Sequence, residues 1–386
     1  MSLAKALEGA EVFTDGDWVE SKDQDPNGDV RLIQLADIGV GEYLDRSARY
    51  LTSKKAAELD CTYLKPGDLL LARMPDPIGR ACLFPGDAKP CVTVVDVCVI
   101  RANQASVDHR WLMHWFNSPL AGSAIRRLTT GTTRKRISRG NIEKLPIVLP
   151  TIEEQRRISR ELDASEALRT KRREAFDKLE ALRSALVSDA LAQYTEREPL
   201  GDHLDFVTSG SRGWAKYYSE SGSRFIRSQD VLMGSISDTD PAFVSPPGNA
   251  ESKRTAIKTG DLLVTITGIV GRVTAASSEL ENSYVSQHVS IARPSATLRP
   301  RFAEAFMNSR EGQAQLERAQ YGQTKPGLNL KQIRGFLLPV PGLKQQDELL
   351  EKLDQVRSQS ERMRRSRMRL DTLFASLQQR AFRDEL

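Results

Sequence analysis

The chain has 386 residues, of which 39% are hydrophobic and 28% charged. This length is typical of two or three domains, and the composition excludes an intrinsically disordered chain. The net charge of +5 neither requires nor excludes nucleic-acid binding. No run of 18 apolar residues is present and the four cysteines form no C-x-x-C pair, so we expect a cytoplasmic protein with reduced thiols and without a membrane span or zinc site.

Residues 1–150 are expected to form a first α+β domain. Short β-branched runs such as residues 91–100, bounded by Gly, Pro and Asp, predict strands joined by turns. A helical pattern follows at residues 108–128, where Trp111 and Trp115 lie four positions apart. This spacing favours packing in a core over a binding role.

The end of this first segment is basic. Residues 126–144 contain seven Lys or Arg and a single acid, with threonines interleaved around Gly131. Basic side chains neutralise phosphates and hydroxyls add hydrogen bonds, so we predict a DNA-binding loop. An ordinary solvated surface has the same charge pattern, and this alternative stays open. The predicted contact residues are Thr132, Thr133, Arg134, Lys135, Arg136 and Arg139.

Two long helices are predicted at residues 151–195 and 342–386. Pro150 and Thr151 are helix-start signals, and neither Gly nor Pro occurs from there to residue 193. The second segment runs to the C-terminus in the same way after Pro341 and Gly342.

Apolar positions in the second long segment alternate at spacings of four and three residues from Leu349 to Ala381. A heptad seam of this length predicts a coiled coil. Arginines at seam positions, such as Arg169 and Arg367, argue against a generic homodimeric zipper. We therefore expect the two helices to pair with each other.

Residues 196–341 are expected to form a second α+β domain, with a strand-like run at 262–269 and a helical patch at 301–319. Its loop at residues 209–218 combines Gly-Ser flexibility with cations and aromatics, which suits base recognition and equally suits a surface loop that covers aromatics. The predicted contacts there are Ser211, Arg212, Trp214, Lys216 and Tyr218. Gln287 is able to pair with adenine, but a buried Gln–His pair with His288 fits the same residues.

The two halves repeat one another. Lys65-Pro-Gly67-Asp68-Leu recurs as Lys258-Thr-Gly260-Asp261-Leu, and further matches follow in order at offsets of 193 to 191 residues. The basic segment has a weaker counterpart at residues 320–334, whose predicted contacts are Gln323, Thr324, Lys325 and Lys331. A two-fold relation between the halves makes the long helices antiparallel, with one globular domain near each end.

This organisation suits the recognition of a split DNA site. Two-fold proteins bind half-sites about 34 Å apart, and the protein geometry sets the spacing. Two non-identical domains on paired helices are therefore expected to recognise an asymmetric, bipartite sequence.

The chain resembles the specificity subunits of Type I restriction–modification systems over essentially its whole length. The resemblance rests on the duplicated Lys-Pro-Gly-Asp-Leu motif and on Gly131-Thr-Thr with the later Leu149-Pro150 and its copy. It also rests on the helix entry Pro150-Thr-Ile-Glu-Glu-Gln155, echoed by Pro341-Gly-Leu-Lys-Gln-Gln346. The order of domain, helix, domain, helix completes it.

The resemblance implies two target recognition domains on double-stranded DNA and an antiparallel coiled coil with pseudo-two-fold symmetry. It implies that the coil docks two methyltransferase (modification) subunits, through which restriction subunits join, in a prokaryotic cytoplasm. The chain itself is then a non-catalytic subunit without cofactors, and S-adenosylmethionine, ATP and Mg²⁺ belong to its partners.

Two alternatives come from other classes of protein. A coiled-coil adaptor without a nucleic-acid role explains the helices but not the duplicated basic loops. A metal-dependent nuclease needs clustered acids and a lysine, which Asp240, Glu251 and Lys253 supply only at loosely suitable spacing.

Overall fold

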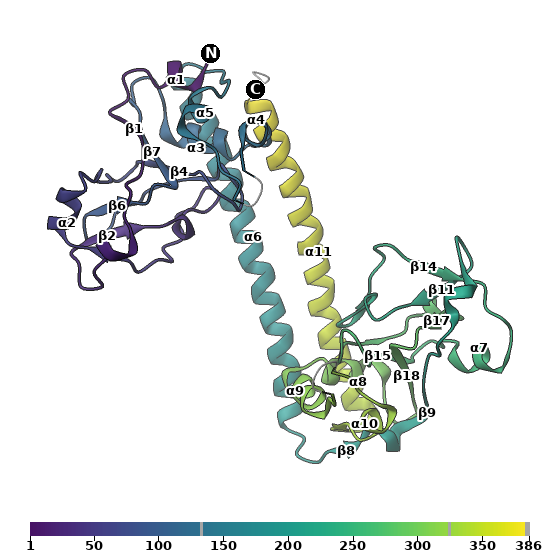
Figure 1. Cartoon of the computed structure of the whole chain (residues 1–386). Coiled ribbons are helices and arrows are strands. Elements are labelled where there is room, and N and C mark those ends of the chain that lie inside the picture. Colours follow the sequence, from purple (N-terminus) through teal and green to yellow (C-terminus); the bar gives the residue numbers. More distant parts are fainter. Residues whose placement is uncertain (132–133, 323–325, 383–386) are drawn as a thin grey trace. The chain divides into compact units, whose positions relative to one another are not determined.

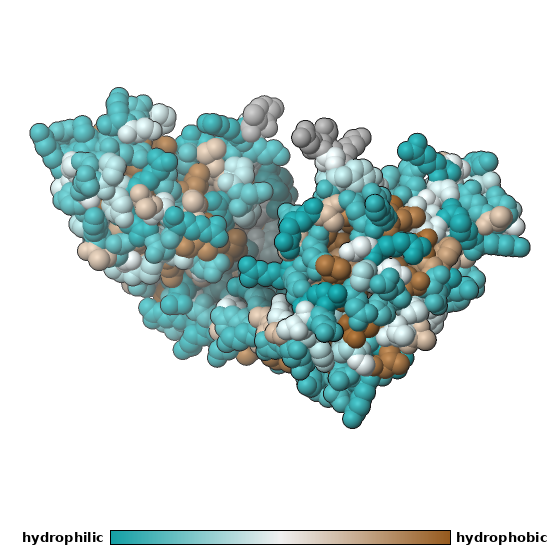
Figure 2. All heavy atoms as spheres, turned by 90° about the horizontal axis from the view of Figure 1, so that it is seen from below, coloured by the Kyte–Doolittle hydropathy of each residue, from teal (hydrophilic) through white to brown (hydrophobic). Residues whose placement is uncertain are grey.

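The computed structural model describes residues 1–131, 134–322 and 326–382 (Figure 1). The chain divides into two compact units: unit 1 is Met1–Arg173 with Arg365–Leu386, and unit 2 is Glu174–Arg364. Both contain sheets and helices, so the predicted mixed α+β class is confirmed. Among the described residues, no helix is long and apolar enough to cross a membrane. The face shown in Figure 2 is mainly hydrophilic, with hydrophobic residues in scattered patches.

The globular part of unit 1 (residues 1–150, the first head) is built on two sheets. A four-stranded antiparallel sheet has the order β1 (Val12–Asp15), β7 (Val97–Arg101), β4 (Leu69–Ala72), β5 (Ala81–Leu83). A three-stranded sheet has the order β3 (Tyr50–Leu51), β2 (Val30–Ile33), β6 (Cys91–Thr93), with β2 and β6 parallel. The strands are short and rich in Val, Leu and Ile because their side chains fill the core.

Short helices complete the first head. They are α1 (Leu3–Ala6), α2 (Ser53–Glu58), α3 (His109–Phe116), α4 (Pro119–Leu128), α5 (Arg139–Glu143) and the 3₁₀ turns η1 (Ser21–Asp23) and η2 (Leu35–Asp37). Asp108 and Ser118 cap α3 and α4 by accepting backbone N–H bonds. Trp111 and Trp115 on α3 are buried in the main core cluster, so their predicted core role is confirmed.

The globular part of unit 2 (residues 196–341, the second head) repeats this plan with additions. Its main antiparallel sheet has the order β16 (Val273–Ala275), β15 (Leu262–Thr265), β18 (Val289–Pro294), β9 (Leu204–Ser209). A second sheet has the order β10 (Tyr218–Ser219), β14 (Ala242–Val244), β11 (Ser223–Ile226), β17 (Tyr284–Val285). Two-stranded pairs join β12 (Val231–Leu232) to β13 (Ser235–Ile236) and β19 (Leu337–Leu338) to β8 (Glu198–Pro199).

The helices of the second head are again short. They are α7 (Ala250–Thr255), α8 (Pro300–Met307), α9 (Arg310–Ala319), α10 (Leu330–Arg334) and the 3₁₀ turns η3 (Leu200–His203), η4 (Trp214–Tyr217) and η5 (Ser278–Leu280). Two long helices, α6 (Ile152–Ala192) and α11 (Leu343–Ala381), contribute to both units.

The repeated Lys-x-Gly-Asp-Leu motif forms a structural turn. In the first head, the buried Asp68 carboxylate accepts the backbone N–H of Lys65 and two N–H groups of Arg101, each at 2.7 Å. In the second head, Asp261 makes the same bonds to Lys258 and Arg293 at 2.7–2.8 Å. These hydrogen bonds raise the pKa of each arginine, and the motif is therefore explained by folding.

A buried glutamine fixes the start of each long helix. The side-chain amide of Gln155 donates to the carbonyls of Ser106 and Pro150 and accepts the N–H of Asp108, at 2.9–3.0 Å. Gln346 does the same with Thr297, Pro341 and Arg299 at 2.8–3.0 Å. Both side chains are 0% exposed, so each helix begins at a position set by the adjoining head.

An ion pair joins each head to its long helix about two turns further on. In unit 1, Arg110 and His114 on α3 contact Asp163 on α6 at 2.9 and 2.8 Å. In unit 2, Arg301 on α8 forms a bidentate pair with Asp354 on α11. Burial by itself raises the pKa of Asp163, but its bonds to His114 and Arg110 outweigh burial and hold that pKa low.

The long helices also contact each other within each unit. In unit 1, Arg169 on α6 donates to Asp371 on α11 at 2.8 Å, and its guanidinium lies 4.4 Å from the centre of the Phe374 ring. In unit 2, Val187 of α6 shares a core cluster with Leu349 and Leu353 of α11. Seam residues of both helices are therefore in contact.

We expect Gln346→Ala to destabilise unit 2 by about 2 kcal/mol, because it leaves one buried N–H and two buried carbonyls without their partner. Urea unfolding followed by circular dichroism measures the change. The exposed neighbour Gln345 provides the control, since Gln345→Ala removes none of these bonds and is expected to change stability by less than about 0.5 kcal/mol. Equal losses in the two variants contradict the role assigned to Gln346.

Candidate nucleic-acid interface

The basic segment of the first head forms a tight hairpin. Thr130 and Arg136 exchange two backbone hydrogen bonds of 2.9 Å, and Ile137 then donates to the carbonyl of Arg73 at 3.0 Å. Gly131 has a φ of +95°, and a Cβ on it would lie 2.5 Å from the Arg134 carbonyl oxygen. Only glycine fits this turn without strain.

Within this hairpin the predicted contact residues differ in accessibility. Arg134 and Lys135 are exposed. Arg136 is half-buried and lies 3.4 Å from Asp96, while Arg139 starts α5 and lies 3.4 Å from Glu143. Thr132 and Thr133 lie outside the described residues. Arg134 and Lys135 are thus the predicted cations of this loop that are most accessible to a phosphate.

The second head has the same hairpin at the same place in the repeat. Tyr321 and Gly327 exchange two backbone hydrogen bonds of 3.0 Å, and Leu328 donates to Ile266 at 2.8 Å. The predicted contacts Gln323, Thr324 and Lys325 lie outside the described residues. Lys331 is exposed on α10, whose start Asn329 caps. The ring of Tyr321 is 52% exposed at the hairpin base; sequence analysis missed it, although it directly precedes the repeated glycine, Gly322.

The loop at residues 209–218 presents some of its predicted residues and buries others. Arg212 and Lys216 are exposed, and Tyr218 is 49% exposed. Ser211 is half-buried, and its hydroxyl accepts a hydrogen bond from Arg254 at 3.0 Å. Trp214 is only 4% exposed.

Trp214 belongs to an aromatic cluster beneath this loop. Its ring stacks on Phe225 with centroids 5.3 Å apart, and Tyr284 lies at 5.2 Å. Its indole N–H donates to Glu251 at 3.2 Å. In this conformation Trp214 supports the loop, whereas Arg212, Lys216 and Tyr218 face solvent.

Gln287 and His288 occupy a partly accessible site near the second hairpin. Their side chains are 3.1 Å apart, His288 also contacts Thr267, and Thr267 forms a bridge with Gly327. Gln287 and His288 therefore form the predicted pair, but the pair is not buried, because His288 is exposed. Sequence analysis did not identify Thr267, because its neighbours in the structure, His288 and Gly327, come from distant segments of the chain.

The acids considered for a nuclease have other contacts. Glu251 accepts from Trp214, and Asp240 lies 3.6 Å from Arg227. Among the described residues, no group of three or more His, Cys, Asp or Glu side chains is arranged to hold a metal ion. These contacts with Trp214 and Arg227 give Glu251 and Asp240 a structural role.

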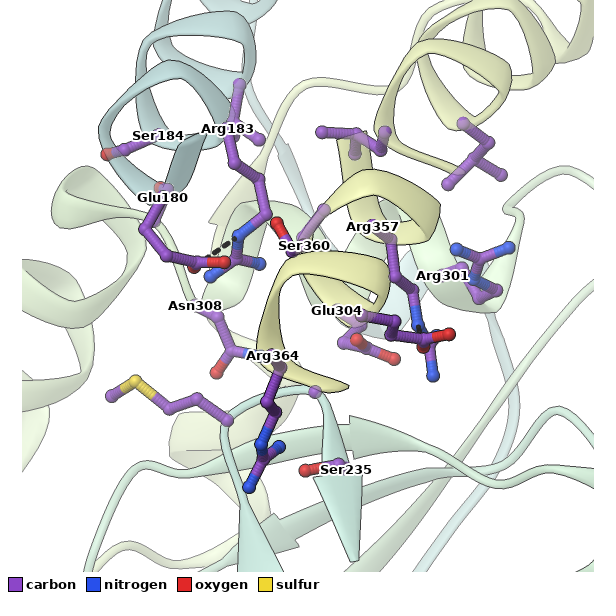
Figure 3. A pocket seen from close by; sticks show the side chains of 18 of the residues that line it. Glu180, Arg183, Ser184, Ser235, Arg301, Glu304, Asn308, Arg357, Ser360 and Arg364 are labelled. Atoms are coloured by element: carbon purple, nitrogen blue, oxygen red, sulfur yellow. Dashed lines mark hydrogen bonds and ion pairs between the residues drawn. The ribbon is translucent and has the colours of Figure 1, made fainter. Parts of the chain in front are cut away.

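Unit 2 contains a pocket of about 310 Å³ lined by α6, α8, α11 and the β12–β13 turn (Figure 3). Its charged side chains pair locally, with Arg183 and Glu180 at 3.2 Å and Arg357 and Glu361 at 3.1 Å. Burial raises the pKa of Glu304, against the effect of its bond from the Ala275 N–H. Because positive and negative side chains are paired around this pocket, its charge does not favour one class of ligand.

The repeat explains why this pocket is open. At an offset of 191 residues, Ser360 of unit 2 corresponds to Arg169 of unit 1, which contacts Asp371 and Phe374. The Ser360 side chain is 9% exposed, and its hydroxyl has no hydrogen-bond partner among the described residues. A short side chain therefore leaves space at a seam position that a long side chain fills in unit 1.

Comparisons with known proteins agree with this architecture. Residues 10–176 match the family described as the Type I restriction modification DNA specificity domain. The specificity subunit of the Type I restriction enzyme EcoBI from Escherichia coli is 20% identical over 334 residues, which cover 78% of this chain and 70% of that protein.

Two solved structures show the same fold. The first comes from a study of complex assembly and conformational transition in the type I R-M system. It has a TM-score of 0.63 at 19% identity, and the match covers 99% of this chain and 97% of the chain in that structure. The second is the S subunit of a Type I restriction–modification system from M. genitalium, with a TM-score of 0.59 at 12% identity and coverages of 99% and 95%.

We expect Ser360→Leu to stabilise unit 2 by about 1 kcal/mol, because it removes a buried, unpaired hydroxyl and adds apolar surface to the seam. Thermal unfolding measures the change. Gln359→Leu places the same side chain on an exposed position of α11 and is expected to give no gain. A lower melting temperature for Ser360→Leu than for the unaltered chain contradicts this description of the pocket.

Proposed function

We propose that this chain, a member of the family of Type I restriction–modification specificity subunits, is the non-catalytic subunit that recognises a bipartite, asymmetric DNA site. Each head is proposed to be a target recognition domain that binds one half of the site, with residues 1–150 and 196–341 as the two domains. Residues 151–195 and 342–386 then form the helical part between them.

The observation that carries this proposal is the duplicated hairpin. Thr130–Arg136 and Tyr321–Gly327 have the same backbone bonds, and in each head the following residue donates to the end of a core strand. Both hairpins carry basic and hydroxyl side chains in the sequence, which is the chemistry that binds phosphates. A coiled-coil adaptor without a nucleic-acid role gives no reason for this repetition.

Exposed cations are proposed to supply the phosphate contacts, and the predicted residues with hydroxyl, amide or exposed aromatic side chains are proposed as neighbours of the bases, whereas the buried Trp214 supports its loop. Neutral hydroxyls and aromatic rings contact sugars and base edges, while cations supply most of the salt-dependent affinity. Among the predicted residues that the structure describes, the exposed cations are Arg134, Lys135, Arg212, Lys216 and Lys331.

The long helices are proposed to pair as an antiparallel coiled coil with pseudo-two-fold symmetry. Arg169 on α6 contacts Asp371 and Phe374 on α11, whereas Val187, further along α6, shares a core cluster with the earlier α11 residues Leu349 and Leu353. Helices of 41 and 39 residues are ~60 Å long at 1.5 Å per residue. A pair of this length is able to set the separation of two half-sites.

The catalytic steps are proposed to belong to partners. Two methyltransferase subunits dock on the helical part, and restriction subunits join through them. S-adenosylmethionine, ATP and Mg²⁺ are then bound by those subunits and not by this chain.

The DNA-binding proposal is tested with the purified chain, alone and with a methyltransferase partner, on duplex DNA over a range of salt concentrations. We expect salt-dependent binding, and we expect Arg134→Glu with Lys135→Glu to weaken binding to all sequences. Losing two phosphate contacts reduces the slope of log K against log salt by about 2.

A control carries the same change of net charge elsewhere, namely Lys54→Glu with Lys352→Glu, both at exposed positions. This double variant is expected to keep the original slope. Absence of salt-dependent affinity in the unaltered chain, with and without the partner, favours the adaptor over the proposed function.

Inserting one heptad at matching positions of α6 and α11 is expected to lengthen the preferred DNA spacer by about three base pairs, because seven residues add ~10.5 Å and each base pair ~3.4 Å. Mapping of methylated sites in a host carrying the intact system measures the spacer. Replacing a heptad without changing the length is the control, and an unchanged spacer after insertion shows that the helices do not set the spacing.

A further inference from the structure

We propose that helix α7 of the second head determines the specificity of one half-site by holding the 209–218 loop in position. Glu251 and Arg254 are the positioning residues, and they act through the loop and not by touching DNA. This inference rests on the proposed function and adds to it the residues that set the shape of a recognition loop.

Arg254 binds the first part of the loop. One of its terminal nitrogens donates to the hydroxyl of Thr208 and to the carbonyl of Ser209 at 3.1 Å, and the other donates to the hydroxyl of Ser211 at 3.0 Å. A planar guanidinium with several fixed donors orders the groups that it binds more firmly than a single ammonium does. The end of β9 and the beginning of the loop are therefore held to α7.

Glu251 binds the middle of the loop, at Trp214. Its carboxylate accepts the indole N–H of Trp214 at 3.2 Å, and Trp214 is buried against Phe225 and Tyr284. Glu251 and Arg254 lie three residues apart on α7, a spacing that puts both side chains on one face of the helix. One short helix thus holds the beginning and the middle of the loop.

The backbone between these two anchors passes close to a neighbouring segment. A Cβ on Gly210 would lie 2.2 Å from the carbonyl oxygen of Val285, so only glycine fits there, and Gly213 has a φ of +86°, which favours glycine. The cationic and aromatic side chains of the loop that remain exposed are those of Arg212, Lys216 and Tyr218.

Holding a loop before binding lowers the entropy that is lost when the loop meets its partner, and it fixes which base edges its side chains reach. Removing the Arg254 contacts should therefore change sequence preference more than general affinity. A phosphate-binding arginine behaves differently, because its loss weakens binding to all sequences and reduces the salt dependence.

Arg254→Ala is tested in the full chain with its methyltransferase partner, by selecting bound duplexes from a random library. We expect the preference at one half-site to fall by roughly tenfold or more, with the other half-site and the salt slope unchanged. Arg254→Lys is expected to restore part of the preference. Lys253→Ala, an exposed neighbour on α7 that makes none of these contacts, is expected to match the unaltered chain.

Glu251→Gln keeps an acceptor for Trp214 and is expected to retain the preference, whereas Glu251→Ala is expected to reduce it. Hydrogen exchange of residues 208–218 without DNA reports the loop directly, and we expect faster exchange in Arg254→Ala while the core strands stay protected. Unchanged exchange or unchanged half-site preference in Arg254→Ala overturns the inference. Failure of the unaltered chain to bind DNA overturns the proposed function instead.

Discussion

The attachment of each long helix to its head is the constraint on which the rest of the structure depends. A single buried glutamine satisfies one N–H and two carbonyls where the chain leaves the head, and an arginine–aspartate pair follows on the helix. A buried backbone group without a partner is costly, so the direction in which each helix leaves its head is fixed. Both units use the same solution, at positions 155 and 346.

The same plan is carried out with different side chains in the two units. Arg169 packs on Phe374 in unit 1, while Ser360 leaves an open pocket in unit 2. The second head also has additional strands, and its helix α7 holds the 209–218 loop. The repeated residues are mostly those that fold the turns and joints, and the divergent ones lie at loops and seams. Shared folding with divergent surfaces is what the proposed recognition of two different half-sites requires.

Sequence analysis predicted what depends on local patterns. The long helices follow from runs without Gly or Pro, and the burial of Trp111 and Trp115 follows from their spacing. The site was less accessible to such reasoning. Trp214 is buried because of Phe225 and Tyr284, and Arg254 reaches a loop more than 40 residues earlier; no local pattern contains these contacts. The contact residues that lie outside the described ranges stay predictions.

The unequal charge of the two hairpins has a kinetic consequence under the proposed function. The first carries Arg134, Lys135 and Arg136 in succession, while the corresponding segment of the second has a single Lys325. With both heads on one duplex, the less basic hairpin releases its phosphates more often, and the remaining contacts keep the DNA near, so that this hairpin binds again at high effective concentration. Release of the DNA then requires the contacts of both heads to open together.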